Sequence, residues 1–186
     1  TFVLGGRRII IKKNNFDTKK GRQHNFDSIV SLLEEFQTFG MIKDWLIEWS
    51  KGLIFDALIG NTDRHQNNWG ILFYSNGEAE LSPWFDNGTS LGHERHETHV
   101  NNWDNKELDD YLHKGKHHLR WDLKEDSKRV GFFEMPKRLL TLDKSLKMPM
   151  LECVERLDTV KLRAFLESLT QLTYTPLESW RIDFIC

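Results

Sequence analysis

The sequence predicts a mainly α-helical domain that carries one small β-hairpin. Apolar residues recur three and four positions apart from Phe26 onward, and a second apolar segment follows around Trp45 and Trp49, as helices with one buried face require. After them comes a short aromatic and β-branched run followed by Asn76-Gly77, a pair typical of hairpin turns. At 186 residues with 39% hydrophobic side chains, the chain can bury the core of one domain.

Two helices are predicted before the hairpin. Asn25 can cap the first helix, because its side chain can accept a hydrogen bond from a free backbone N–H group, and Gly40 stops that helix. The second helix contains apolar residues from Met41 to Ile59 and ends at Gly60. Glycine is favoured at such an end, because the residue after a helix often needs a positive φ.

The hairpin is predicted from Trp69–Tyr74 and Glu78–Leu81, with Pro83 closing the second strand. Both central residues of the expected type I′ turn have positive φ, which Asn76-Gly77 adopts readily. The expected turn therefore places this pair at its centre.

The segment after the hairpin, residues 92–128, is polar and rich in histidine and lysine. It predicts short helices joined by loops, with a break at Gly115. Helices are also predicted for the remainder of the chain. Asp158 can cap one of them, and Thr175–Glu178 combines a capping box with proline at the first helical position of another.

Composition excludes several classes of function. The formal net charge of −2 gives no overall attraction to nucleic acid or to an anionic membrane. Two cysteines argue against a disulfide scaffold and fit a reducing compartment. No uninterrupted apolar run reaches the roughly 18 residues of a membrane-spanning helix. We therefore expect a cytoplasmic domain without membrane contact or direct nucleic-acid binding.

The residues with the clearest chemical meaning follow Gly60. Asp63 and, five positions later, Asn68 lie on the loop before the hairpin, and a second carboxylate, Asp86, lies after it. A loop that turns back can bring Asp63 and Asn68 into one pocket, and the returning hairpin can bring Asp86 to Asn68. Phosphoryl transfer uses such a set, because one carboxylate takes the proton of the acceptor hydroxyl while an amide and a second carboxylate hold divalent cations. These oxygen ligands suit Mg²⁺.

Each of these residues also has a structural interpretation. Asp63 belongs to an Asn-Thr-Asp sequence, and such residues often cap local backbone groups in a turn. Asp86 can form an Asx-type turn before Gly88, and His65 can be a structural loop histidine. The joint spacing of Asp63, Asn68 and Asp86 around a hairpin favours catalysis over these separate explanations.

Two segments carry a family resemblance. Residues 57–70, ALIGNTDRHQNNWG, and residues 83–91, PWFDNGTSL, resemble the HipA-like serine/threonine kinases, bacterial enzymes with a protein-kinase-like fold. Several members are toxins of toxin–antitoxin systems. The Asp-Arg-His-x-x-Asn core is also similar to the catalytic loop of the phosphatidylinositol 3- and 4-kinases. The resemblance continues through residues 111–121 and 181–185, and it covers most of the chain from about Asn25 onward.

The resemblance implies a protein-kinase-like C-lobe and a role for each matching residue. Asp63 matches the catalytic base, and Asn68 and Asp86 match ligands of Mg²⁺. His65 matches a histidine of the catalytic loop that contacts the γ-phosphate or braces the loop. The resemblance also implies ATP as the phosphoryl donor, a serine or threonine hydroxyl of a protein as the acceptor, and an antitoxin-type protein as a partner.

The N-terminal part of the sequence differs from the motif pattern of this family. Its members carry a glycine-rich phosphate loop and a nucleotide-binding lysine in an N-lobe, but Gly5-Gly6 does not match that loop, and Lys12 and Lys13 lie close to the C-lobe helices. We therefore assign no residue to nucleotide binding. Residues 1–24 are expected to be a strand or linker that remains from, or connects to, an N-lobe. Residues 25–186 are expected to form the C-lobe, with both ends truncated.

Two alternative functions stay open. A non-catalytic kinase-like fragment or pseudokinase would act as a protein-interaction module and would not bind Mg-ATP. A metal-dependent hydrolase would use His93, His96 and His99, whose spacing of three can align imidazoles on one helical face. Because neither a cysteine pair nor a His-Glu-x-x-His motif accompanies them, a solvated loop is favoured.

A basic strip at residues 114–121 has a similar double interpretation. Its lysines, histidines and arginine, with Trp121 as a stacking platform, could bind phosphate or nucleic acid. Acidic neighbours at residues 109, 110, 122, 125 and 126 cancel much of its positive charge. A substrate-contacting or ordinary surface segment is therefore favoured.

Overall fold

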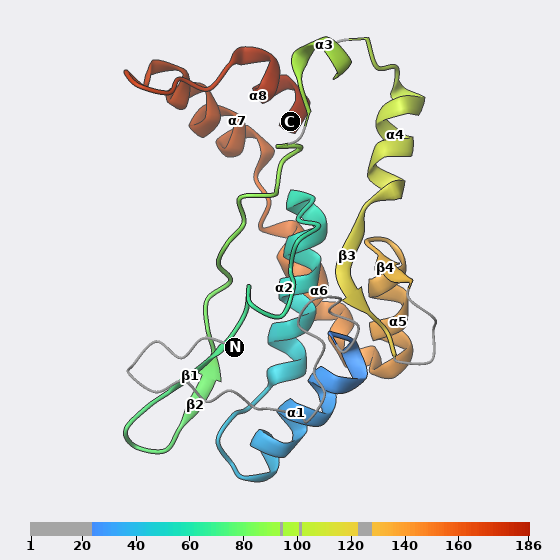
Figure 1. Cartoon of the computed structure of the whole chain (residues 1–186), viewed down its shortest axis with the longest axis vertical. Helices are drawn as coiled ribbons and strands as arrows, with labels where there is room; N and C mark the ends of the chain where they lie inside the picture. Colours follow the sequence, from blue (N-terminus) through green and yellow to red (C-terminus); the bar gives the residue numbers. More distant parts are fainter. Residues whose placement is uncertain (1–23, 94, 101, 123–127) are drawn as a thin grey trace.

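The computed structural model describes residues 24–93, 95–100, 102–122 and 128–186 (Figure 1). The expected N-terminal strand or linker before residue 24, with Gly5-Gly6, Lys12 and Lys13, lies outside the described residues. The elements follow the chain in the order α1 (Phe26–Thr38), α2 (Trp45–Ile59), β1 (Ile71–Phe73), β2 (Ala79–Leu81), α3 (Glu97–Val100), α4 (Asn105–Lys114), β3 (Lys116–Arg120), β4 (Arg129–Gly131), α5 (Glu134–Leu142), α6 (Lys147–Glu155), α7 (Thr159–Ser168) and α8 (Ser179–Ile185). The described fold is mainly helical, as the sequence predicts, and it has two small antiparallel hairpins where one was predicted.

The first two helices have the expected caps. Asn25 accepts a hydrogen bond from the backbone N–H of Ser28 at 2.9 Å and so caps α1. Gly60 ends α2 with φ of 67°, which confirms the predicted helix end. The start of α2 differs from the prediction, because the helix begins only at Trp45, after Asp44 with φ of 48°. The left-handed backbone at Asp44 prevents the helix from extending back to Met41.

The hairpin of β1 and β2 forms where it was predicted, but with a different turn. The backbone N–H of Gly77 donates to the carbonyl of Tyr74 at 3.1 Å, and the N–H of Tyr74 donates to the carbonyl of Glu78 at 2.9 Å. Within this fully described loop, Gly77 alone has positive φ, at 87°. The type I′ prediction for Asn76-Gly77 is therefore wrong. Three loop residues separate the closing pair, and the left-handed glycine completes that longer turn.

A second hairpin was not predicted. Residues 92–128 do contain α3 and α4, and Gly115 ends α4 as expected, but β3 follows directly and pairs with β4. In β3, His117 and Leu119 are buried while Lys116 is exposed, so the strand has the burial alternation of two residues. The strand was not recognised in the sequence because two of its residues are adjacent histidines, which do not count as apolar and therefore show no alternation.

The C-terminal helices show one correct cap and one incorrect cap. Asp158 accepts a hydrogen bond from the N–H of Lys161 at 3.0 Å and caps α7, as predicted. The capping box predicted at Thr175–Glu178 is wrong, since α8 begins at Ser179 and no side chain caps it. The N–H of Leu177 instead donates to the carbonyl of residue 169 at 3.1 Å, which holds this segment in a turn outside the helix.

Helix α2 lies at the centre of the core (Figure 1), in contact with α5, α6, β2 and β3. Trp49 is fully buried on α2, and its ring makes edge contacts with Trp69 at 5.1 Å and with Trp84 at 5.2 Å between centroids. A Cβ at Gly52 would lie 1.8 Å from Cζ2 of Trp84, so only glycine lets this indole lie on the helix. The predicted core position of Trp45, Trp49 and Trp69 is confirmed.

Helices α3, α7 and α8 lie at the far end of the molecule from α1 (Figure 1). Arg181 on α8 connects α8 to the segment before α3, because its guanidinium donates to the carbonyls of Gly92 at 2.6 Å and Arg95 at 2.8 Å.

Among the helices that the structure describes, none has both the length and the apolar character needed to cross a bilayer.

Candidate active site

The loop that follows α2 is fixed at its start by Asn61. The side-chain oxygen of Asn61 accepts hydrogen bonds from the backbone N–H of Asp63 and from the hydroxyl of Thr89, both at 3.0 Å. Its amide nitrogen donates to Oδ1 of Asp56 on α2 at 3.0 Å. One buried asparagine therefore connects the loop to the helix before it and to the segment after the hairpin.

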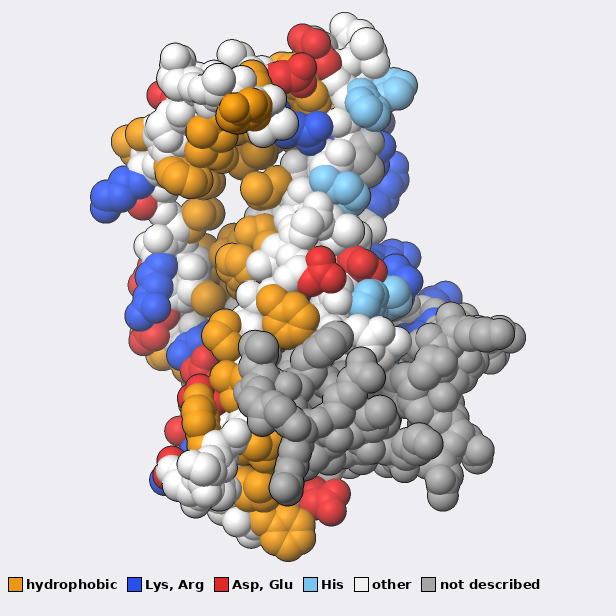
Figure 2. Space-filling view, turned by 60° about the vertical axis from the view of Figure 1, so that its left-hand side comes forward, with side chains coloured by type: hydrophobic (Ala, Val, Ile, Leu, Met, Phe, Trp, Pro, Cys, Tyr) orange, Lys and Arg blue, Asp and Glu red, His pale blue; other side chains and the backbone are white. Residues whose placement is uncertain are grey.

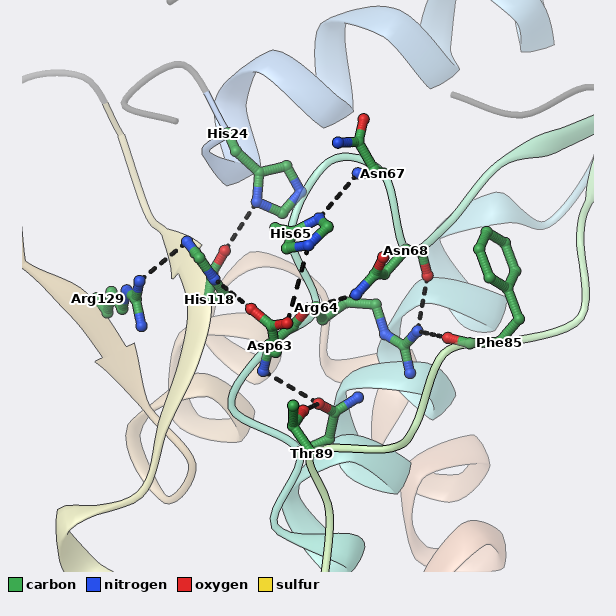
Figure 3. A network of polar contacts seen from close by, with 11 residues as sticks. His24, Asp63, Arg64, His65, Asn67, Asn68, Phe85, Thr89, His118 and Arg129 are labelled. Carbon is green, nitrogen blue, oxygen red and sulfur yellow. Dashed lines mark hydrogen bonds and ion pairs between the residues drawn. The ribbon is translucent and has the colours of Figure 1, made fainter. Parts of the chain in front are cut away.

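Asp63 and Asn68 lie together, as their spacing predicts. Nδ2 of Asn68 donates to the backbone carbonyl of Asp63 at 2.9 Å, so the loop turns back between these two residues (Figure 3). Since Nδ2 faces this carbonyl, Oδ1 of Asn68 points away from it. Within the described part of the chain, no donor is hydrogen-bonded to that oxygen.

Arg64 forms a buried ion pair beneath the loop. Its Nε and Nη2 donate to the two carboxylate oxygens of Asp56 at 3.0 and 2.8 Å, in the bidentate geometry that gives the strongest arginine–carboxylate pairs. The side chains of Arg64 and Asp56 are 1% and 0% exposed. Burial raises the pKa of Asp56, whereas the hydrogen bonds from Arg64 and Asn61 lower it.

The same guanidinium joins the two loops that carry the predicted site. Nη1 of Arg64 donates to the carbonyl of Asn68 at 2.6 Å and to the carbonyl of Phe85 (Figure 3). Nη2 also donates to the side-chain oxygen of Asn87 at 2.6 Å. The sequence did not assign a role to Arg64 or Asp56. Their signals were the place of Arg64 in the Asp-Arg-His-x-x-Asn core and an aspartate within the otherwise apolar second half of α2.

Asp86 lies between two residues that Arg64 holds, Phe85 and Asn87. Its φ is 57°, a left-handed conformation that aspartate tolerates better than most residues. Its side chain is exposed, and no hydrogen bond to its carboxylate is found within the described residues. Asp86 and Asn68 therefore lie on loops bound to one arginine. Asn68 is 3% exposed, and its side-chain oxygen, like the carboxylate of Asp86, is of the type that a hard cation such as Mg²⁺ prefers.

The carboxylate of Asp63 is flanked by two histidines (Figure 3). Nδ1 of His118 lies 3.2 Å from Oδ1, and Nε2 of His65 lies 3.8 Å from Oδ2. His118 comes from β3 and was not among the predicted site residues. Its sequence signals were its place in the segment 111–121, where the family resemblance continues, and its place in the basic strip of residues 114–121.

His65 is held by its own loop. Its Nδ1 accepts a hydrogen bond from the backbone N–H of Asn67 at 3.2 Å, so Nε2 carries the ring proton and faces Asp63. The distance of 3.8 Å is too long for a hydrogen bond. This geometry suits a histidine that braces the loop, and it also leaves Nε2 able to donate to a ligand beside Asp63.

The candidate site is open to solvent. The side chains of Asp63 and His65 are 39% and 28% exposed. Figure 2 shows acidic and histidine side chains next to one another at the surface, near the middle of the molecule. A substrate can therefore reach the carboxylate of Asp63 without a rearrangement of the described residues.

Two other regions had a functional interpretation in the sequence, the histidine cluster of residues 93–99 and the basic strip of residues 114–121, and their geometry differs from that of the Asp63 loop. The rings of His96 and His99 are 6.4 Å apart, and no group of three or more potential metal ligands of the His, Cys, Asp and Glu types converges in the described part of the chain. In the basic strip of residues 114–121, the side chains of β3 alternate between the two sides of the strand, so His117 is buried. Trp121 stacks on Phe26 with 4.6 Å between centroids and is thus part of the packing around α1.

A mainly helical lobe in which a carboxylate loop and a second acidic loop meet beside a hairpin is the arrangement of a kinase-like C-lobe. A crystal structure of a Helicobacter pylori proinflammatory kinase, CtkA, has a similar fold, with a TM-score of 0.65 and 19% sequence identity. The similarity covers 87% of this chain and 54% of the CtkA chain, so the present chain spans about half the length of that kinase. No curated protein sequence matches the chain. Residues 11–141 match the HipA-like C-terminal domain, and the chain belongs to this family.

Proposed function

We propose that this chain supplies the catalytic base and the metal ligands of a HipA-like kinase that transfers the γ-phosphoryl group of ATP to a serine or threonine hydroxyl of a protein. The main support for the proposal is that one residue connects the loop of Asp63 with the loop of Asp86. Arg64 binds the carbonyl of Asn68 on the Asp63 loop and the carbonyl of Phe85 next to Asp86. Phosphoryl transfer depends on such fixed positions more than on covalent chemistry by the protein.

Asp63 is the proposed base. Its carboxylate is partly exposed and can accept the proton of the acceptor hydroxyl as that oxygen bonds to the γ-phosphorus. The bond from the γ-phosphorus to the bridging oxygen breaks in the same exchange, and ADP leaves. His65, at 3.8 Å from the carboxylate, is placed to brace the loop or to contact the transferred group.

Asn68 and Asp86 are the proposed ligands of Mg²⁺. Both offer side-chain oxygens that no described donor occupies, and these are the donor atoms that Mg²⁺ prefers. The ion would neutralise the negative charge of the phosphate groups during transfer. We assign no described residue to the α- and β-phosphates, and we propose that an N-lobe of the full-length protein contributes those contacts.

The proposal is tested by conservative changes to the two carboxylates in the full-length protein. Asp63→Asn and Asp86→Asn should each lower Mg-ATP-dependent phosphotransfer by about 100-fold or more, because the base and a metal ligand are lost while size is kept. Asp110→Asn, a change at an exposed position of α4, is the matched control and should retain wild-type activity. Transfer is measured with radiolabelled ATP, and phosphoserine and phosphothreonine are identified by mass spectrometry.

A wild-type rate in either variant would show that the assigned role is wrong. Saturable binding of Mg-ATP with stabilisation of the folded protein separates a kinase from a non-catalytic interaction module. If the full-length protein neither binds Mg-ATP nor transfers phosphate, the alternative of a pseudokinase is favoured.

We also propose a cytoplasmic protein with protein partners, namely the substrate and a partner of the antitoxin type. The near-neutral net charge of −2 supports protein partners over nucleic acid. Both cysteines are free thiols, which fits a reducing compartment. Affinity purification of the full-length protein followed by mass spectrometry would test the partner class.

A further inference from the structure

The carboxylate of Asp63 has a neighbour from a distant part of the chain, His118 on β3. Nδ1 of His118 lies 3.2 Å from Oδ1 of Asp63, and Nε2 of the same ring lies 2.9 Å from Nη2 of Arg129 (Figure 3). Arginine can only donate hydrogen bonds. Nε2 of His118 must therefore accept, the ring proton lies on Nδ1, and Nδ1–H donates to Asp63.

The surroundings of His118 keep the ring neutral. Burial lowers the pKa of His118, the nearby charge of Arg129 lowers it further, and only the contact with Asp63 raises it. Among the described residues, the other titratable groups that act on the ring are two histidines, His65 at 5.8 Å between centroids and His24. A neutral ring agrees with the hydrogen bonds, since a doubly protonated ring could not accept from Arg129.

The backbone of β3 is also fixed at this residue. Nδ1 of His24 donates to the carbonyl of His118 at 2.8 Å, and Nε2 of His24 accepts from the indole of Trp69 at 3.2 Å. Trp69 directly follows Asn68, so this chain of contacts connects β3 to the end of the Asp63 loop. His24 is 3% exposed, and burial lowers its pKa to about 4, which keeps both hydrogen bonds in place near neutral pH.

We infer that His118, with its tautomer fixed by Arg129, positions the carboxylate of Asp63 for proton transfer. This inference rests on the proposed role of Asp63 as the base. The hydrogen bond from His118 occupies Oδ1 and fixes the rotation of the carboxylate, which leaves Oδ2 to face an acceptor hydroxyl. His118 is a positioning residue, because it acts on the base and does not contact the reacting atoms.

Alternation along β3 explains how the strand delivers this residue. His117 is buried between β3 and the core, with its ring against Phe132 at 4.7 Å, whereas His118 points to the opposite side, toward the loop. Two adjacent histidines therefore have different surroundings, and only the second can reach Asp63.

The kinetic test compares three variants in the full-length protein. His118→Leu removes the donor and should lower kcat about 10- to 100-fold with little change in KM for ATP, because a misplaced catalytic group lowers the rate and not nucleotide binding. His118→Asn keeps an N–H near the position of Nδ1 and should restore most of the activity. His113→Leu is the matched control, since His113 makes a similar contact with Asp109 at 3.3 Å on the surface of α4.

A spectroscopic test does not depend on activity. Histidine-selective ¹⁵N labelling of the full-length protein should show the neutral Nδ1–H tautomer for His118 at pH 7, with the signal assigned by its loss in His118→Asn. Arg129→Leu should shift that signal toward a mixture of tautomers. An Nε2–H tautomer or a charged ring in the wild-type protein would overturn the inference, as would a wild-type kcat in His118→Leu.

The outcomes also separate this inference from the proposed function. If Asp63→Asn is inactive while His118→Leu keeps full activity, the kinase proposal stands and the positioning role is wrong. If the wild-type protein transfers no phosphate, the proposed function and the catalytic use of His118 are both wrong. The NMR spectrum would then still report whether Arg129 and Asp63 fix the ring.

Discussion

Arg64 has the largest number of distinct roles of any single residue in the candidate site. Replacement by alanine leaves the carboxylate of Asp56 buried without its partner, and loss of one member of a buried pair costs about 3–5 kcal/mol. Arg64→Ala should therefore lower the free energy of unfolding by about this amount in urea denaturation. Arg64→Lys should also destabilise the protein, because one ammonium cannot replace the bidentate fork.

The matched control for this prediction is Arg163→Ala. Arg163 pairs with Asp183 at 3.0 Å on the surface, where such pairs contribute less than about 1 kcal/mol. An equal loss of stability in both alanine variants would contradict the structural role of Arg64.

At the scale of single residues, the sequence predicted the part of the site that is local. Asp63 and Asn68 are five positions apart, and the predicted turn between them is confirmed by the hydrogen bond from Nδ2 of Asn68 to the carbonyl of Asp63. His118 was missed because no local spacing connects β3 with the loop. Arg64 was missed for another reason: arginine is expected at the surface, and its burial depends on Asp56, eight positions earlier on α2.

At the scale of elements, the end of α2 determines how the Asp63 loop begins. Gly60 has φ of 67°, and a residue with a Cβ is strained in that conformation by about 1 kcal/mol or slightly more. Gly60→Ala should lower the free energy of unfolding by about 1 kcal/mol and should also lower phosphotransfer, because the strain acts directly before Asn61 and Asp63. Thermal unfolding and the kinase assay measure the two effects.

Gly40 provides a matched control for Gly60. It has the same φ of 67°, and a Cβ at either glycine would meet no atom within 4 Å. Gly40→Ala should therefore cost the same stability after α1 but leave phosphotransfer unchanged. An equal loss of activity in both variants would mean that general destabilisation, and not the loop, explains the effect.

The wrong predictions of secondary structure have a common physical cause. β3 was not predicted because one of its two buried positions is a histidine, so the sequence lacks the apolar alternation of a strand. The capping box at Thr175–Glu178 was predicted from local residue types, but the bond from the N–H of Leu177 to residue 169 holds that segment outside the helix. In both cases a tertiary contact overrides the local preference.

At the scale of the whole molecule, two buried histidines make stability depend on pH. Burial lowers the pKa of His24 to about 4 and that of His117 to about 3, both below the ordinary value of 6.5. The unfolded chain therefore binds more protons than the folded chain below pH 6.5, and stability falls as the pH decreases from 6.5 toward 4. Each such histidine removes up to about 1.4 kcal/mol per pH unit in this range.

His117 allows this prediction to be tested separately from the site. Neither ring nitrogen of His117 has a hydrogen-bond partner among the described residues, so leucine can replace it without leaving a donor unpaired. His117→Leu should reduce the slope of the free energy of unfolding against pH between 6.5 and 4, measured by urea denaturation. His113→Leu, at an exposed position, should not. An unchanged slope in His117→Leu would show that His117 does not contribute.

The fold class was predictable from the whole chain, whereas the arrangement around α2 was not. Helical spacing and the hairpin signal depend on neighbouring residues, and both were correct. The contact of Trp49 with Trp69 and Trp84 joins segments that only the folded chain brings together. A sequence pattern contains no information about which face of α2 receives which indole.

The contact between Gly52 and Trp84 has a geometric consequence for the two acidic loops. The indole of Trp84 rests directly on the backbone of α2, and Arg64 lies over the same ring at 4.7 Å. Asp86 follows Trp84 by two positions, and Asp63 follows the end of α2 by four. The ring of Trp84 thus contacts both the helix that precedes the Asp63 loop and the arginine of that loop, and it anchors the segment that carries Asp86 to the same helix.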